Sequence, residues 1–199
     1  DWILYTPQPQ PYKMDSTSFM HKTIEIKSEK LYLRELLPKD VTKDYVTWLN
    51  DPEVNTYLES RFVKHTLESV KEYVKGVFYD DQYYMFGIFL RKNSKYVGNI
   101  KLGPINLHHK RSEIGLMIGD KSAWGRGVGT EAIKMVTKFG FNELNLLKIS
   151  AGMYESNIFS KKSFEKVGYK AEGLYRNHVD SCSGREGYWV VGISSGELD

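Results

Sequence analysis

A glycine-rich segment, residues 124–130 with the sequence WGRGVGT, has the composition of a phosphate-binding loop. It lies between an alternating apolar run, Ile114 to Ile118, and a run with helical periodicity, Ala132 to Phe139. At the start of a helix the backbone N–H groups point outward and the macrodipole favours an anion. Glycine also lets the backbone approach a phosphate closely. The segment therefore predicts an anion site, with a plain left-handed turn as the alternative interpretation.

The position of these glycines argues against two common nucleotide-binding folds. A dinucleotide-binding domain begins with its glycine-rich βαβ unit, repeats it, and carries an acidic residue ~20 positions later. Here more than half of the chain precedes the glycines, and Glu155 is badly placed for that role. The phosphate loop of nucleoside triphosphatases needs Gly-Lys-Ser/Thr, which is missing.

The surrounding elements follow from hydrophobic periodicity and turn residues. Strands are expected within residues 23–36 and at 83–90, 96–102, 113–118, 146–153, 169–178 and 187–193. Helices are expected at 41–49, after Thr66, from the glycine loop to about residue 142, and at 157–166. Asp40 is placed to cap the first helix and Pro52 to end it. This order predicts an α+β fold, a mixed and mostly antiparallel sheet with helices on both faces.

The composition is that of an ordinary soluble globular protein. Of 199 residues, 41% are hydrophobic and 27% charged, and the formal net charge is +3. Lysine and arginine are scattered among acidic residues, so we expect no nucleic-acid partner. No apolar run approaches the ~20 residues of a membrane span, so we expect no membrane partner. The N-terminus also lacks the order of charges and apolar residues typical of a signal peptide.

The domain organisation is expected to be simple. Residues 1–20 are rich in Pro, Gln and Ser and are interpreted as a flexible tail or a non-native remnant, with residues 21–199 as a single domain. Cys182 is the one cysteine, so no intrachain disulfide can form and a cytoplasmic location is expected. Its neighbours indicate a hairpin turn rather than a catalytic thiol.

Four short motifs occur in a fixed order along the chain. They are GLMIGD at 115–120, WGRGVGTEAI at 124–133, Asn157-x-x-Ser160, and FEKVGY at 164–169. Together they resemble the GNAT acyl-CoA N-acetyltransferases, in the branch with the ribosomal-protein N-terminal acetyltransferases and amino-sugar acetyltransferases. The resemblance covers roughly residues 23–195. It implies a V-shaped opening between the strands at 113–118 and 146–153, acetyl-CoA as cosubstrate, and no metal.

The resemblance also implies where the cosubstrate binds. Pantetheine lies in the opening like an added strand, and a backbone N–H near Leu116 or Met117 meets the thioester carbonyl. Asn157 matches a position that hydrogen-bonds the cofactor arm, and it could equally cap the following helix. Trp124 stands where the family usually has Arg or Gln, which leaves the backbone amides unchanged. The residues matching the pyrophosphate loop are Trp124, Gly125, Arg126, Gly127, Val128, Gly129 and Thr130.

Acetyl transfer to an amine needs a base that takes a proton from the ammonium. Strand alternation puts Glu113 on the same face as Gly115 and Met117, near the expected thioester. Glu113 is therefore the candidate base, and an ion pair with a neighbouring basic residue is the alternative. His108 and His109 have suitable pKa values but lie in what resembles an exposed turn.

The leaving thiolate needs an acid, and here the chain departs from the family pattern. Many relatives carry a tyrosine where this chain has Phe164, which cannot donate a proton. The branch it resembles offers Ser160 instead, as a direct donor or through a water. Ser160 is therefore both a candidate catalytic residue and a candidate cofactor contact.

The acceptor pocket is expected between the loop after the first helix and the C-terminal hairpin. The segments 58–62 and 99–104 are similar to those of enzymes acting on nucleotide-linked amino sugars, whose diphosphate Arg61 and Lys101 would suit. The proposed substrate-binding residues are Glu59, Arg61, Asn99, Lys101 and Tyr154.

The predicted function is transfer of an acetyl group to a primary amine of a small molecule such as an amino sugar. Protein N-terminal acetylation and non-catalytic acyl-CoA binding are the alternatives. Aromatic residues near the C-terminal hairpin fit a dimer surface as well as a substrate wall, so a homodimer stays open.

Overall fold

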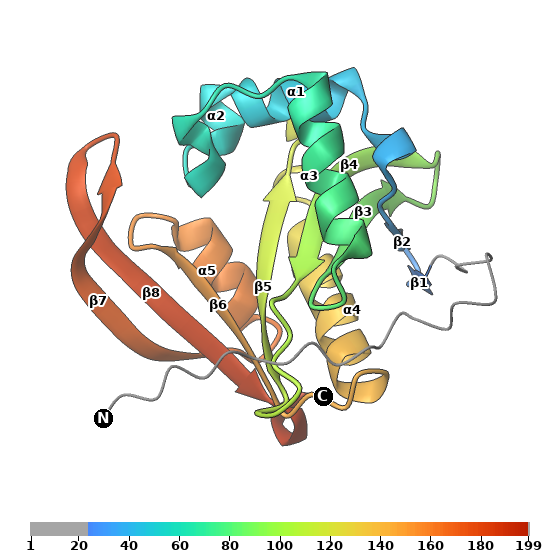
Figure 1. Ribbon diagram of the computed structural model, residues 1–199. Coiled ribbons are helices and arrows are strands. Elements are labelled where there is room, and N and C mark those ends of the chain that lie inside the picture. Colours follow the sequence, from blue (N-terminus) through green and yellow to red (C-terminus); the bar gives the residue numbers. More distant parts are fainter. Residues whose placement is uncertain (1–23, 199) are drawn as a thin grey trace, which may run out of the picture.

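The computed structural model describes residues 24–198, so the interpretation of residues 1–20 lies outside the described residues. Strands within this range form an eight-stranded sheet in the order β1-β2-β3-β4-β5-β6-β8-β7 (Figure 1). Neighbours pair antiparallel except β5 and β6, which pair parallel. The strands are β1 (Glu25–Lys27), β2 (Leu31–Glu35), β3 (Tyr84–Leu90), β4 (Lys95–Leu102), β5 (Arg111–Ile118), β6 (Lys148–Tyr154), β7 (Lys170–Ser181) and β8 (Gly184–Ser194). The predicted mixed, mostly antiparallel α+β fold is confirmed.

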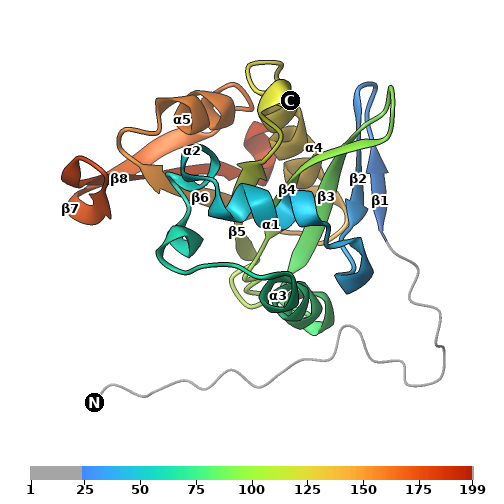
Figure 2. The same cartoon turned by 90° about the horizontal axis from the view of Figure 1, so that it is seen from above.

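Helices cover both faces of this sheet (Figures 1 and 2). On one face α1 (Lys43–Asn50) and α3 (Leu67–Tyr79) bury Tyr45, Leu49 and three valines of α3 against Met85 and Met117. On the other face α4 (Val128–Asn142) and α5 (Ile158–Glu165) pack on the central strands. None of the helices in the described range has the length and apolar character of a membrane span.

Short elements connect the helices and differ from the prediction in two places. The cap of α1 is Thr42, because Asp40 lies in a 3-10 turn, η1 (Pro38–Asp40), where it accepts from the Leu37 N–H at 2.8 Å. Pro52 does not simply end α1, since it also begins α2 (Pro52–Asn55), where a missing N–H costs nothing. The other 3-10 turns are η2 (Glu59–Phe62), η3 (Lys121–Ala123) and η4 (Ser195–Glu197).

The parallel pair β5–β6 is short, and this shapes the centre of the sheet. Residues 111–113 of β5 pair with residues 148–150 of β6, and no pairing of the two strands continues beyond them in the described structure. The rest of β5 stays on β4, and the rest of β6 stays on β8. The two strands therefore diverge, as predicted, and each presents an unpaired backbone edge to the other.

The position of β5 depends on a close backbone contact with β4. A Cβ atom placed on Gly98 would lie 2.2 Å from the Met117 carbonyl oxygen and 2.9 Å from the Ile118 Cα. Only a residue without a side chain lets the two strands keep their register here. Gly76, inside α3, has nothing within 4 Å of the same position.

We predict opposite effects on stability from adding one methyl group at these two glycines. Gly98→Ala should lower the free energy of unfolding by about 1–3 kcal/mol, because β5 must shift. Gly76→Ala should raise it by about 0.5–1 kcal/mol, because alanine favours a helix interior. Chemical denaturation of both variants beside the wild type checks this. Equal stability of Gly98→Ala and wild type would contradict the close contact.

Candidate functional site

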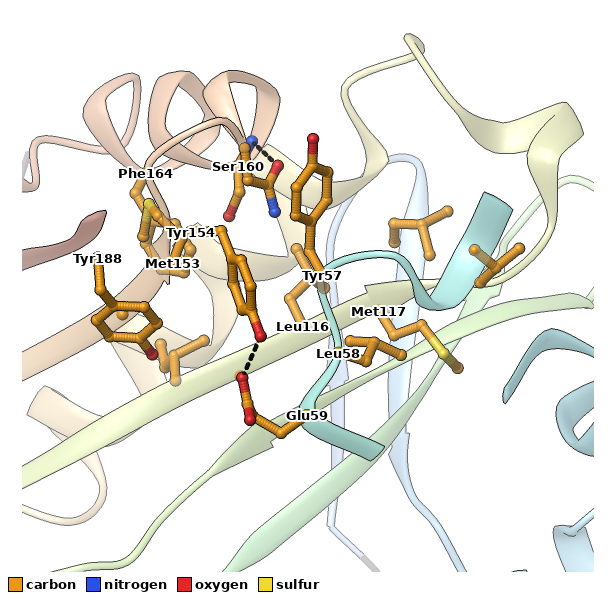
Figure 3. Close-up of a pocket in the computed structure, with 16 residues that line it drawn as sticks. Tyr57, Leu58, Glu59, Leu116, Met117, Met153, Tyr154, Ser160, Phe164 and Tyr188 are labelled. Carbon is orange, nitrogen blue, oxygen red and sulfur yellow. Dashed lines mark hydrogen bonds between the residues drawn. The ribbon is translucent and has the colours of Figure 1, made fainter. Parts of the chain in front are cut away.

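A cavity of about 230 Å³ lies where β5 and β6 diverge. Figure 3 shows that its walls come from β5, the end of β6 with the start of α5, the segment from α2 to η2, and Tyr188 of β8. Leu116, Met117, Asn157, Ser160, Glu59 and Tyr154 were predicted from the sequence, and all of them line this cavity. Tyr57 and Tyr188 also line it and were not predicted.

The open edge of β5 offers a backbone donor to this cavity. The Gly103 N–H donates to the Glu113 carbonyl at 2.9 Å, so the N–H and C=O of Glu113 and of every second residue after it face β4. The N–H and C=O of the residues between them, including Leu116, face the open edge. Of the two predicted oxyanion donors, this alternation favours the Leu116 N–H over that of Met117.

The glycine loop has the geometry that an anion site requires. Gly125 and Gly127 have φ angles of 70° and 77°, and a Cβ atom on either would meet nothing within 4 Å. Gly127 is the N-cap of α4 and provides no side-chain cap, so the N–H groups of the first turn have no partner from that position. Glu131 in this turn bonds to the Ser28 hydroxyl. The left-handed turn is thus present, whereas the anion site stays a prediction, and none of the loop residues 124–130 lines the cavity.

Trp124 has a structural role in addition to its place in the loop. Its indole N–H donates to the Ile118 carbonyl oxygen at 2.8 Å. This bond ties the start of the glycine loop to the last residue of β5. The loop and the open edge of β5 are therefore held in a fixed relation.

Asn157 and Ser160 lie together on one wall of the cavity. The Asn157 side chain accepts a hydrogen bond from the Ser160 backbone N–H at 3.2 Å, so Asn157 does cap α5 (Figure 3). Its cofactor role stays a prediction, compatible with this cap because the amide NH₂ is not the capping atom. Phe164 is buried and packs edge-on against Tyr169, which leaves Ser160 as the hydroxyl of α5 in the cavity wall.

Glu113 lies on the predicted face of β5, since Met117 on that face packs with α1 and α3. It is exposed and does not line the cavity. Within the described residues it forms no ion pair with Arg111 or another basic side chain. Burial raises the pKa of Tyr188, and the charge of Glu113 adds to this effect. His108 and His109 are exposed, as predicted.

Three residues predicted as acceptor contacts form one network. The Tyr154 hydroxyl donates to Glu59 Oε1 at 2.6 Å, and Arg61 Nη1 donates to the Tyr154 oxygen at 2.8 Å. Arg61 Nη2 also donates to the Asp180 carbonyl oxygen in β7. The network therefore joins η2, the end of β6 and the β7–β8 hairpin at one end of the cavity.

The other two predicted acceptor contacts do not line the cavity. Asn99 is only 4% exposed and accepts from the Tyr96 hydroxyl at 2.6 Å. Lys101 donates to the Tyr73 hydroxyl on α3 at 2.9 Å. Tyr188 was missed because η2 is far from β8 in sequence, and nothing in the local sequence of β8 indicates which of its residues face η2.

Comparisons with known proteins agree with this geometry. A family described as "Acetyltransferase (GNAT) domain" matches residues 30–170. A probable N-acetyltransferase, YjcK of Bacillus subtilis, is 32% identical over 125 residues, which are 62% of this chain and 68% of that protein.

Two solved structures share the fold at low sequence identity. Spermidine N-acetyltransferase from Vibrio cholerae, crystallised with CoA and spermine, has a TM-score of 0.77 and 19% identity, over 85% of this chain and 98% of that one. RimJ of Mycobacterium smegmatis, in complex with CoA-disulfide, has a TM-score of 0.74 and 18% identity, over 88% of both chains. With the family match over most of the chain, these findings show that the chain belongs to the GNAT acetyltransferase family and is an N-acetyltransferase.

Proposed function

We propose that this enzyme transfers an acetyl group from acetyl-CoA to the primary amine of a small molecule. The proposal of a small acceptor rests on two hydrogen bonds that the Arg61 side chain donates. They link η2 to both Tyr154 and the Asp180 carbonyl, and so bridge the acceptor end of the cavity. An extended peptide needs an open groove along a strand edge. A bridge at this place favours a compact acceptor over a protein N-terminus.

The proposed acceptor is an amino sugar. The hydrogen bonds of Arg61 and Lys101 bear on whether this sugar is free or linked to a nucleotide. Arg61 and Lys101 were expected to hold the diphosphate of a nucleotide-linked sugar. Arg61 is engaged by Tyr154 and Asp180, and Lys101 by Tyr73. Because both cations already have partners, a free amino sugar fits better than a nucleotide-linked one. The spermine named with the Vibrio enzyme makes polyamines a second class to compare.

The proposed roles are divided between the glycine loop, which lies outside the cavity lining, and residues of the cavity wall. The N–H groups after Gly127 hold the pyrophosphate, and Asn157 bonds the cofactor arm. The Leu116 N–H stabilises the oxyanion that forms when the amine adds to the thioester. Ser160 supplies a proton to the leaving thiolate. For the base, the sequence predicts Glu113, and the structure adds Glu59 as a second carboxylate.

We predict that the wild-type enzyme binds acetyl-CoA and CoA and acetylates small amines in preference to peptides. Calorimetry measures binding of both cosubstrates, and thiol release measures turnover with amino sugars, their nucleotide-linked forms, polyamines and short peptides. Faster turnover with peptides than with every small amine would contradict the proposed acceptor class. Cosubstrate binding without turnover of any amine would favour the non-catalytic alternative.

We predict that Gly127→Val weakens binding of acetyl-CoA and CoA by about 100-fold or more, because charge-assisted bonds to the loop are lost. A β-branched side chain is strained at a φ of 77° and would occupy the open space in front of α4. Gly184→Val is the matched control, since Gly184 has a φ of 110° and open space but lies in the β7–β8 turn. Calorimetry should show unchanged cosubstrate affinity for the control. Micromolar binding by Gly127→Val would mean that another loop holds the pyrophosphate.

A further inference from the structure

Glu59 is a carboxylate in a cavity wall that is otherwise largely apolar and aromatic. Its neighbours along the wall are Tyr57, Leu58, Tyr154 and Tyr188. A carboxylate at the edge of such a wall is stabilised by a cationic partner or by hydrogen bonds. Glu59 Oε1 accepts one bond, from the Tyr154 hydroxyl, and no bond to Oε2 is formed within the described residues. The second oxygen is therefore available to a ligand.

The nearby guanidinium does not neutralise Glu59 directly. Arg61 donates to the Tyr154 oxygen, the Leu58 carbonyl and the Asp180 carbonyl. It forms no ion pair with Glu59 within the described residues. Arg61 thus fixes Tyr154, and Tyr154 fixes Glu59, so the carboxylate is oriented without being paired with a positive charge.

The phenols beside Glu59 remain neutral donors near pH 7. Burial raises the pKa of Tyr154, and its bond to Glu59 raises it further against the opposing effect of Arg61. Burial also raises the pKa of Tyr188, with contributions from Glu113 and Glu59. The charged and titratable groups around Glu59 are thus Tyr57, Arg61 of η2, Tyr154 of β6 and Tyr188 of β8, with Glu113 of β5 acting on the same Tyr188.

We propose that Glu59 binds the ammonium group of the acceptor and takes its proton, and that Tyr154 and Arg61 are positioning residues. This inference rests on the proposed function. It differs from the sequence prediction, because Glu59 lines the cavity and Glu113 does not, although both carboxylates are exposed. Figure 3 shows the Tyr154 hydroxyl directed at Glu59, with Leu116 of β5 in the same cavity.

The proposed step balances as follows. The ammonium transfers one proton to Glu59 Oε2, and the freed lone pair forms a C–N bond with the thioester carbonyl carbon. When the tetrahedral adduct collapses, the C–S bond breaks and the nitrogen loses a second proton. One proton stays on the CoA thiol and the other leaves Glu59 for solvent, so an ammonium and a thioester become an amide, a thiol and a proton.

The test compares Glu59→Gln and Glu113→Gln with two kinds of nucleophile. The first is the best amine acceptor of the wild type, which is an ammonium ion at neutral pH. The second is hydroxylamine, which is already uncharged there and needs no base before attack. Glu68→Gln is the matched control, because Glu68 is an exposed carboxylate on α3 away from the cavity. Acetyl-CoA affinity of each variant checks that the fold is retained.

We expect Glu59→Gln to lower kcat/KM for the ammonium acceptor by about 100-fold or more and to abolish the acidic limb of its pH profile. Turnover of hydroxylamine should stay within about fivefold of wild type, as should both reactions of Glu68→Gln. The assignment is overturned if Glu113→Gln causes the selective loss instead. It is also overturned if Glu59→Gln lowers both reactions equally. A wild type that acetylates no amine shows failure of the proposed function itself, before any variant is made.

Tyr154→Phe tests the positioning role separately. The Tyr154 hydroxyl is the one side-chain donor to Glu59 among the described residues, so the variant leaves the carboxylate without its positioning bond. The rate should fall by about tenfold with the ammonium acceptor and little with hydroxylamine. An equal loss with both nucleophiles would show that Tyr154 does not act through Glu59.

Discussion

The structure depends on the early end of pairing between β5 and β6. Three residues of each strand form the parallel ladder, and from there β5 follows β4 while β6 follows β8. Unpaired backbone groups at a strand edge are strong hydrogen-bonding groups that need partners. Where the two strands part, they offer such groups to a ligand arm that can take the place of a strand. The cavity and the open backbone edge of β5 both follow from this one interruption.

The two ends of the opening are held by different kinds of interaction. At the cosubstrate end the loop, the cap of α4 and the indole of Trp124 are close in sequence to β5. At the acceptor end the wall is built from η2, β6 and the β7–β8 hairpin, through side chains that reach across the cavity. The recognition of acetyl-CoA that we propose therefore relies largely on backbone groups. The acceptor recognition that we propose relies on individual side chains.

This difference explains what could be predicted from the sequence. Glycine spacing indicated the loop because that signal is local, and the resemblance to the GNAT family indicated Asn157, Ser160 and the open edge of β5. Alternation could not separate Leu116 from Met117, which required the ladder geometry. It also favoured Glu113 by face, since no local signal shows that η2 folds over the cavity. Tyr188 was missed for the same reason. The helix cap was placed at Asp40, two positions before Thr42, because short turns compete for the same capping groups.

The bonds of Arg61 have a consequence for how the molecule assembles. They join residues 93 and 119 positions apart, whereas the glycine loop forms from consecutive residues. Contacts of large sequence separation form late, because the chain must first lose the entropy of the intervening loop. We therefore expect the acceptor wall to form after the glycine loop during folding and to open before it in local unfolding. Backbone amide exchange in η2 and the hairpin would then be faster than in α4.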